Sequence, residues 1–182
     1  WPIYPGAETY TGRQLHAADY RTPAEFAGQH VVVVGGGNSA AQILAEVSTT
    51  ATTTWAVTRP PRFLPDDVDG RALFATARAR VQALAEGRDH NGVAGLGDIV
   101  MVASVRDARD RGVLVAQPMF TRLIAHGVAW PDGSEQPCDA VIWCTGFRPA
   151  LRHLRSLNLR DAGGHIPVGG PSGTQALGEP RL

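Results

Sequence analysis

Three consecutive glycines follow a run of four valines early in the chain, and this segment has the clearest chemical potential. The run Val31–Val34 is β-branched and apolar, as is typical of a strand buried on both faces. Gly35 suits the tight turn out of such a strand, and Gly37, which has no Cβ, lets a pyrophosphate approach the backbone. Ala40 takes the third position of a Gly-x-Gly-x-x-Gly/Ala pattern and permits close packing of helix on strand. The segment therefore predicts a dinucleotide-binding turn.

The residues after the glycines predict the helix that such a turn requires. Apolar residues recur at helical spacing, at Ala40, Ile43, Leu44 and Val47. Asn38 or Ser39 is expected to cap the helix, whose free N–H groups and dipole favour an anion. Glycine triplets also occur by chance in turns that bind no ligand. The strand before the glycines and the helix after them nevertheless favour dinucleotide binding.

The adenosine end of a dinucleotide is expected about 20 residues further on, where a second strand ends. That strand is predicted over residues 53–57, and Thr58 and Arg59 follow it. An acidic residue at this place would accept hydrogen bonds from both ribose hydroxyls, but the first acid here is Asp66. Arg59, with Arg62 three residues on, offers planar donors that suit a 2′-phosphate. We therefore predict NADPH over NADH. Stacking of the arginine on adenine and simple solvation are the alternatives.

Length and composition indicate an ordinary globular domain. The 182 residues are 43% hydrophobic and 19% charged, with a formal net charge of zero, so neither nucleic acid nor a membrane is indicated as a partner. The sequence contains no signal peptide and no run of 18 apolar residues, which makes a cytoplasmic location the default expectation. All 17 basic residues are arginines, which excludes lysine-dependent chemistry such as Walker-type loops, Schiff bases and Tyr-x-x-x-Lys pairs.

Neither the cysteines nor the histidines form a metal-binding pattern. Cys138 and Cys144 are too few for a disulfide framework and lack metal-ligand spacing. The six histidines form no H-E-x-x-H type of cluster. We therefore predict no metal site.

The order of patterns predicts an α/β fold, a Rossmann-like three-layer dinucleotide-binding domain with a parallel sheet and an inserted antiparallel meander. The elements expected after the first βαβ unit are a helix at 66–88, a short strand at 99–102, an exposed helix or turn at 106–111, the meander within 112–134 and a buried strand at 139–144. The last strand runs into Thr145 and Gly146, at the edge where α/β sheets bind ligands. A plain strand exit is the alternative for these two residues.

The loop at 10–20 matches the Phe-x-Gly-x-x-x-His-x-x-x-aromatic pattern of the flavin-containing and Baeyer–Villiger monooxygenases. Its matching residues are Tyr10, Gly12, His16 and Tyr20, with tyrosine in place of the first phenylalanine. In that family the pattern precedes an NADPH-binding glycine motif that often continues Gly-Asn-Ser, as at 37–39, and a later strand ends in Thr-Gly-Tyr/Phe, as at 145–147. Three motifs in the family's order make the chain resemble the central NADPH-binding part of such a flavoprotein.

The resemblance implies a division of the chain and a reaction. Residues 1–28 resemble a connector, residues 29–147 the NADPH-binding domain, and residues 148–182 a tail returning to an FAD domain whose glycine motif does not precede Trp1. In the intact enzyme, hydride would pass from NADPH to FAD, and O2 would then oxygenate a nitrogen, sulfur or carbonyl group of a small substrate. His16 is expected to couple the two cofactor sites, and this chain alone is expected to be inactive.

Two alternatives remain open. A relative of the pyridine-nucleotide-disulfide reductases would share the fold but needs a redox Cys-x-x-Cys pair, whereas Cys138 and Cys144 are six residues apart. A non-catalytic NADP-binding or interaction module is favoured by the missing FAD motif and disfavoured by the intact loop at 10–20. The substrate and the oligomeric state are not indicated by the sequence.

Overall fold

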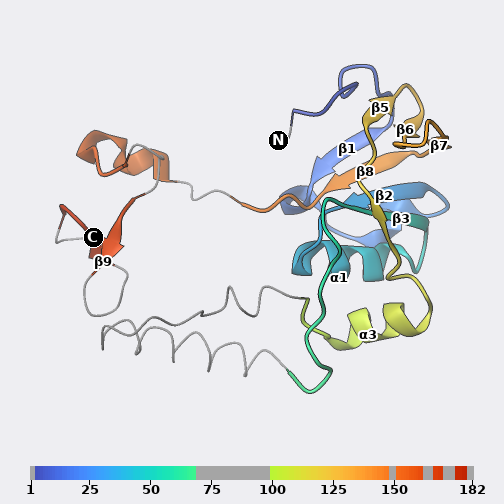
Figure 1. The fold of residues 1–182 in the computed structure, drawn as a ribbon, viewed down its shortest axis with the longest axis horizontal. Coiled ribbons are helices and arrows are strands. Elements are labelled where there is room, and N and C mark those ends of the chain that lie inside the picture. Colours follow the sequence, from blue (N-terminus) through green and yellow to red (C-terminus); the bar gives the residue numbers. More distant parts are fainter. Residues whose placement is uncertain (1–2, 69–98, 148–150, 162–165, 170–174, 180–182) are drawn as a thin grey trace. The chain divides into compact units, whose positions relative to one another are not determined.

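The computed structural model describes residues 3–68, 99–147, 151–161, 166–169 and 175–179 (Figure 1). The chain divides into two compact units. The first contains the described residues up to 68 together with 99–146, and the second contains the described residues from 147 onward. The helix expected at 66–88 lies almost wholly outside the described residues.

The first unit is built on a five-stranded parallel sheet in the order β1-β8-β2-β3-β4. The strands are β1 (Arg13–His16), β2 (His30–Val34), β3 (Thr52–Val57), β4 (Ala116–Pro118) and β8 (Ala140–Trp143). From β2 the chain continues to β3 and β4 on one side, whereas β8 and β1 lie on the other. The strand order thus reverses at β2, and ligands of such sheets bind beside the carboxyl ends at this point. The Rossmann-like fold class is confirmed.

Helices cover one face of this sheet. Helix α1 (Asn38–Val47) follows β2, and α3 (Ala103–Asp110) packs against α1 (Figure 1). Val31 and Val33 join the core on this face with Leu44 of α1 and Val105 of α3. The valine run therefore behaves as expected, since its alternate residues enter the cores on both faces of the sheet.

The other face of the sheet carries a second core, which includes Val32, Val34 and Trp143 together with Phe120. Next to it lies an antiparallel sheet of three strands, β5 (Arg122–Ile124), β6 (Gly127–Ala129) and β7 (Glu135–Pro137). The antiparallel meander is thus confirmed, but it begins later than expected. Residues 116–118 belong to the parallel sheet instead, because alternation identifies a strand without identifying its partner.

Two further expectations differ from the structure. Within the segment read as a connector, Arg13–His16 form edge strand β1, with Leu15 buried against β8. Two short 3₁₀ helices follow, η1 (Ala17–Asp19) and η2 (Pro23–Phe26). The strand expected at 99–102 is reduced to a single parallel bridge between Phe63 and Ile99. Both pairings are non-local, so the local pattern does not reveal them.

The second unit contains the 3₁₀ helix η4 (Leu151–Leu157) and an antiparallel pair, β9 (Val168–Gly169) and β10 (Gln175–Ala176). In the part of the chain that the structure describes, no helix is long and apolar enough to cross a membrane.

Candidate dinucleotide site

The predicted site residues gather at one edge of the parallel sheet. Gly35 follows β2, Thr58 follows β3, Cys144 follows β8, and His16 is the last residue of β1. Because all five strands are parallel, their carboxyl ends lie on the same edge. The strand-order reversal falls between β2 and β8, so the glycine turn and the exit of β8 flank the expected crevice.

Gly35 is held closely by both neighbouring strands. Its φ of +131° lies in a region that favours glycine, and a Cβ there would stand 2.4 Å from the carbonyl oxygen of Cys144. The Gly35 N–H donates to the carbonyl of Ala56 at 3.0 Å, and its carbonyl accepts from the Trp55 indole N–H at 2.7 Å. The turn is therefore held by the end of β8, by the backbone of β3 and by the side chain of Trp55 in the same strand.

Gly37 leaves the start of α1 open. It is the residue before the helix, and among the described residues no side chain caps the helix there. A Cβ built on Gly37 would meet no atom within 4 Å. The backbone of Gly37 is therefore open to a ligand, and it immediately precedes the first-turn N–H groups, which are the donors that bind anions at helix starts.

The capping prediction for Asn38 is wrong. Its side-chain Oδ1 instead accepts a hydrogen bond of 2.8 Å from the N–H of Val100. Because Gly37 is the cap, Asn38 and Ser39 are the first two residues of the helix, one or two places late for capping. Ser39 is exposed, whereas Ala40 is completely buried, as close packing of helix on strand requires.

A pocket of about 510 Å³ opens beside the ends of β3 and β4. It is lined by residues 57–61 and 116–119, so Thr58 and Arg59 lie on one wall and Gln117 and Met119 on the other. Arg59 is exposed, and its carbonyl oxygen would be 3.6 Å from a Cβ on Gly36, so its backbone adjoins the glycine turn. Arg62 is exposed too but does not line this pocket.

The second wall of this pocket was missed from the sequence. Gln117, Pro118 and Met119 carry no motif, and they reach the site because β4 pairs with β3 in parallel. The only signal that would have found them is that strand pairing, which local patterns do not give. Ala116, Pro118 and Met119 make this wall mostly apolar, which suits a flat ring such as adenine.

His16 joins the ends of β1 and β8. Its Nδ1 accepts from the N–H of Ala18 at 3.2 Å, so the proton of the neutral ring is placed on Nε2. Nε2 then donates to the carbonyl oxygen of Gly146 at 3.0 Å. Gly146 has φ +87° and is exposed, as is Thr145, so His16 holds the backbone where the chain leaves the sheet.

The cysteines do not form a redox pair. They flank β8 at opposite ends, and a four-residue strand alone spans about 13 Å at ~3.3 Å per residue, whereas bridged Cα atoms lie roughly 4.4–6.8 Å apart. Burial raises the pKa of Cys144 to about 12 and also raises the pKa of Cys138. Burial therefore favours the protonated thiol at both positions, whereas a redox cysteine needs its thiolate. This arrangement disfavours a disulfide reductase.

Over the described ranges, no group of three or more histidine, cysteine, aspartate and glutamate side chains could hold a metal ion.

Known proteins similar to this chain are flavin-dependent monooxygenases and oxidoreductases. The family described as flavin-binding monooxygenase-like matches residues 2–65. A solved structure of a flavin-containing monooxygenase from Stenotrophomonas maltophilia is 51% identical, covers 99% of this chain and superposes with a TM-score of 0.80. An uncharacterized oxidoreductase CzcO of Bacillus velezensis is 28% identical over 84% of this chain. Flavin-containing monooxygenase 5 of Mus musculus is 41% identical over 56 residues.

The chain corresponds to only part of these proteins. It covers 48% of the Stenotrophomonas chain, 45% of the Bacillus protein and 10% of the mouse protein. The match to the family description includes the loop at 10–20, the glycine turn and Arg59.

Proposed function

Because this chain is a relative of the flavin-containing monooxygenases, we propose that it is the NADPH-binding part of an FAD-dependent monooxygenase. NADPH supplies a hydride and FAD activates O2, so the share of this chain is to bind and orient the nicotinamide cofactor. We also propose that the FAD site lies largely outside this chain and that the substrate is a small molecule with a nitrogen, sulfur or carbonyl group. The proposed location of the intact protein is the cytoplasm. The domain boundaries at 28/29 and 147/148 remain predictions.

The observation that carries the proposal is the open start of α1 beside the pocket that Arg59 lines. The uncapped first turn and the bare Cα of Gly37 suit the pyrophosphate. The pocket at the ends of β3 and β4 is within the roughly 300–1,000 Å³ range of small-molecule sites, and its mostly apolar walls suit adenine. Thr58 and Arg59 would then meet the ribose and its 2′-phosphate.

On the other side of the crevice, His16 acts as a positioning residue. It fixes the backbone of Gly146, and with it Thr145, through the hydrogen bond from Nε2. A Cβ on Gly35 would touch the carbonyl of Cys144, the residue directly before Thr145. Thr145 and Gly146 therefore leave the sheet beside the glycine turn. We assign Thr145 and Gly146 to the part of the site toward which the nicotinamide half of the cofactor extends.

Calorimetric titration of the purified chain with NADPH and NADH tests the proposal. We expect NADPH to bind more tightly than NADH, and we expect no oxidation of bound NADPH in air. Addition of FAD, NADPH and O2 to the chain with and without its upstream sequence separates a monooxygenase part from a non-catalytic module. A non-catalytic NADP-binding module would bind NADPH but never support its oxidation, even within the intact protein. Absence of NADPH binding by the folded chain would refute the proposal.

A further inference from the structure

A second pocket of the first unit opens at the opposite edge of the parallel sheet from the candidate dinucleotide site. Its volume is about 410 Å³, and it is lined by residues 11–12, 137–139, His30 and His126. Residues 11–12 precede β1, His30 begins β2 and Asp139 precedes β8, so the pocket lies at the amino ends of these parallel strands. The five residues of β2 separate the two edges by about 17 Å at ~3.3 Å per residue. This pocket is therefore separate from the glycine turn.

Backbone hydrogen bonds hold the walls of this pocket together. The N–H of Cys138 donates to the carbonyl of His126 at 3.0 Å, so His126 lies beside the residue that precedes Asp139. The Asp139 Oδ2 accepts from the backbone N–H of His30 at 2.8 Å. A Cβ on Gly12 would stand 2.6 Å from the carbonyl oxygen of Asp139, so that wall has room only for glycine. Segments far apart in the sequence thus form one preformed pocket.

The pocket offers hydrogen-bond acceptors that no described residue uses. The Thr11 hydroxyl donates its one proton to the carbonyl of Ala125 at 2.7 Å, so it can only accept from the His126 Nδ1, which is 3.0 Å away. The neutral His126 ring then has its lone pair on Nε2, which bonds to no described residue. The Asp139 Oδ1 likewise accepts no hydrogen bond from the described chain. A ligand that donates hydrogen bonds therefore suits this pocket.

The charge of the pocket is negative. Asp139 is the one carboxylate among the described residues that line it, and none of them is an arginine. Burial lowers the pKa of His30, so this imidazole is uncharged at neutral pH. Arg13, the next residue along the chain after the first wall, pairs with Glu25 at 2.7 Å and lies over the Phe26 ring. The pocket therefore favours a ligand with a positive charge.

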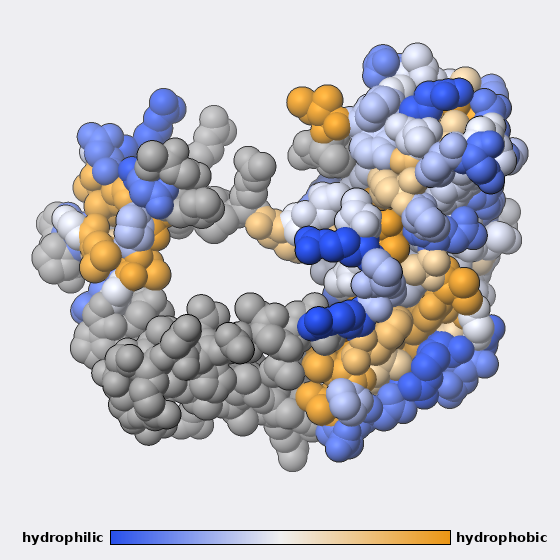
Figure 2. All heavy atoms as spheres, viewed as in Figure 1, coloured by the Kyte–Doolittle hydropathy of each residue, from blue (hydrophilic) through white to orange (hydrophobic). Residues whose placement is uncertain are grey.

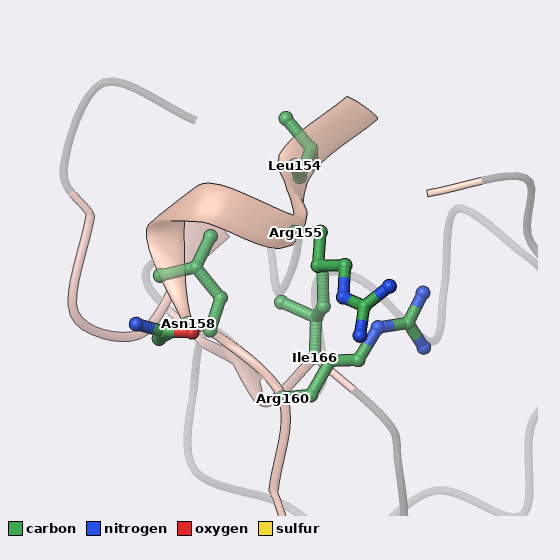
Figure 3. A pocket seen from close by; sticks show the side chains of 6 residues that line it. Leu154, Arg155, Asn158, Arg160 and Ile166 are labelled. Carbon is green, nitrogen blue, oxygen red and sulfur yellow. The ribbon is translucent and has the colours of Figure 1, made fainter. Parts of the chain in front are cut away.

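Other surfaces differ in character from this pocket. Figure 2 shows hydrophilic and hydrophobic residues side by side on one face of the first unit, and this mixture does not by itself identify a ligand. In the second unit, Arg155 and Arg160 are among the residues that line a pocket of about 250 Å³ (Figure 3). The guanidinium groups of that pocket disfavour a cation, so it does not suit the same ligand.

We infer that the pocket at the amino edge of the sheet binds a small organic cation that carries a primary ammonium group. The ammonium would lie against the Asp139 carboxylate and donate to the His126 Nε2. Pro137 and the buried Cys138 offer a small apolar side to the carbon body of the ligand. A metal ion fits less well, because no group of three or more described histidine, cysteine, aspartate and glutamate side chains could hold one. The inference does not depend on the proposed NADPH site.

Calorimetric titration of the whole chain with benzylamine tests the inference, with benzyl alcohol as an uncharged probe of nearly the same shape. We expect benzylamine to bind at least about tenfold more tightly, because its hydrogen bonds are charge-assisted. Asp139→Asn should weaken benzylamine binding at least about tenfold without loss of the fold, because the amide oxygen can still accept from the His30 N–H. His126→Phe, which retains a flat ring without Nε2, should weaken it at least about threefold.

Glu8→Gln removes an exposed carboxylate outside the pocket and is the matched control, and melting temperatures show that each variant is folded. Equal weakening in Glu8→Gln and Asp139→Asn would show non-specific attraction to negative charge and overturn the inference. It is also wrong if the wild-type chain binds benzyl alcohol as tightly as benzylamine, or binds neither. If Asp139→Asn does not fold, unchanged benzylamine affinity in His126→Phe decides against it. Binding of Zn²⁺ without binding of benzylamine would make the pocket a metal site instead.

Discussion

The imidazole of His16 donates a hydrogen bond of 3.0 Å to the carbonyl oxygen of Gly146, across 130 residues of sequence. The bond joins the carboxyl ends of β1 and β8, which pair in parallel up to His16 and Trp143. It therefore fixes the path of the chain at the point where it leaves the first unit. We therefore expect the His16 side chain to matter more for the geometry of the candidate dinucleotide site than for the packing of the core.

Replacement of His16 by alanine tests that role. One hydrogen bond contributes about 1 kcal/mol, so the melting temperature should fall by only about 2–4 °C. In the intact enzyme the variant should reduce flavin more slowly or release peroxide, as measured by stopped-flow absorbance and a peroxide assay. His153→Ala, an exposed histidine of η4, serves as control. A large loss of stability with normal flavin reduction would instead assign His16 a structural role.

Gly37 and Gly35 provide a matched pair of alanine substitutions. Gly37→Ala adds a methyl group where no protein atom lies within 4 Å, so the fold should persist while nucleotide affinity falls at least tenfold, about 1.4 kcal/mol. Gly35→Ala places its methyl group 2.4 Å from the Cys144 carbonyl in an unfavourable φ region, so it should destabilise the fold itself. Calorimetry and urea unfolding measure the two effects. Unchanged affinity in folded Gly37→Ala would contradict the pyrophosphate site.

Arg59 should determine the preference for NADPH. Arg59→Ala removes charged hydrogen bonds to the 2′-phosphate and should weaken NADPH binding much more than NADH binding, by roughly 1.5–3 kcal/mol. Arg62→Ala should have a smaller effect, since Arg62 does not line the pocket. Calorimetric titration with both nucleotides measures these differences. An equal loss for both would indicate that Arg59 stacks on adenine, and no loss would place the ribose elsewhere.

His30 makes the stability of the first unit depend on pH. Its Nε2 lies 2.9 Å from the Thr54 hydroxyl and 3.3 Å from the Gln136 amide, between β2, β3 and β7. Burial lowers the pKa of His30, although the Asp139 carboxylate opposes the shift. The unfolded chain therefore takes up this proton at higher pH than the folded chain does, and stability should fall as pH decreases below about 6.5.

Urea unfolding at a series of pH values measures this effect. In His30→Gln, which retains a polar side chain beside Thr54, the decrease of the unfolding free energy below pH 6.5 should be smaller than in the wild type. An identical pH dependence in both proteins would show that other groups cause it.

Local patterns were sufficient for the parts of the fold that depend on neighbouring residues. The valine run, the apolar stripe of α1 and the strand ending at Val57 follow from side-chain periodicity alone. The cap expected at Asn38 or Ser39 is one or two residues late because the extended backbone of Gly37, rather than a capping side chain, begins α1. Strand β1 and the Gln117–Met119 wall depend on partners far away in sequence, and no periodicity within a few residues identifies such partners.

The position of β8 between β1 and β2 also determines how the sheet is assembled during synthesis. The ribosome releases the first two strands long before residues 140–143, and they have no direct pairing with each other in the finished sheet. Until β8 inserts between them, β1 has no strand partner on either side and β2 has one unpaired edge. Such long-range parallel pairing folds slowly and exposes strand edges that chaperones recognise. A nascent chain stalled before residue 140 would therefore leave β1 without a partner and β2 with an open edge, and aggregation during translation would depend on how quickly β8 follows.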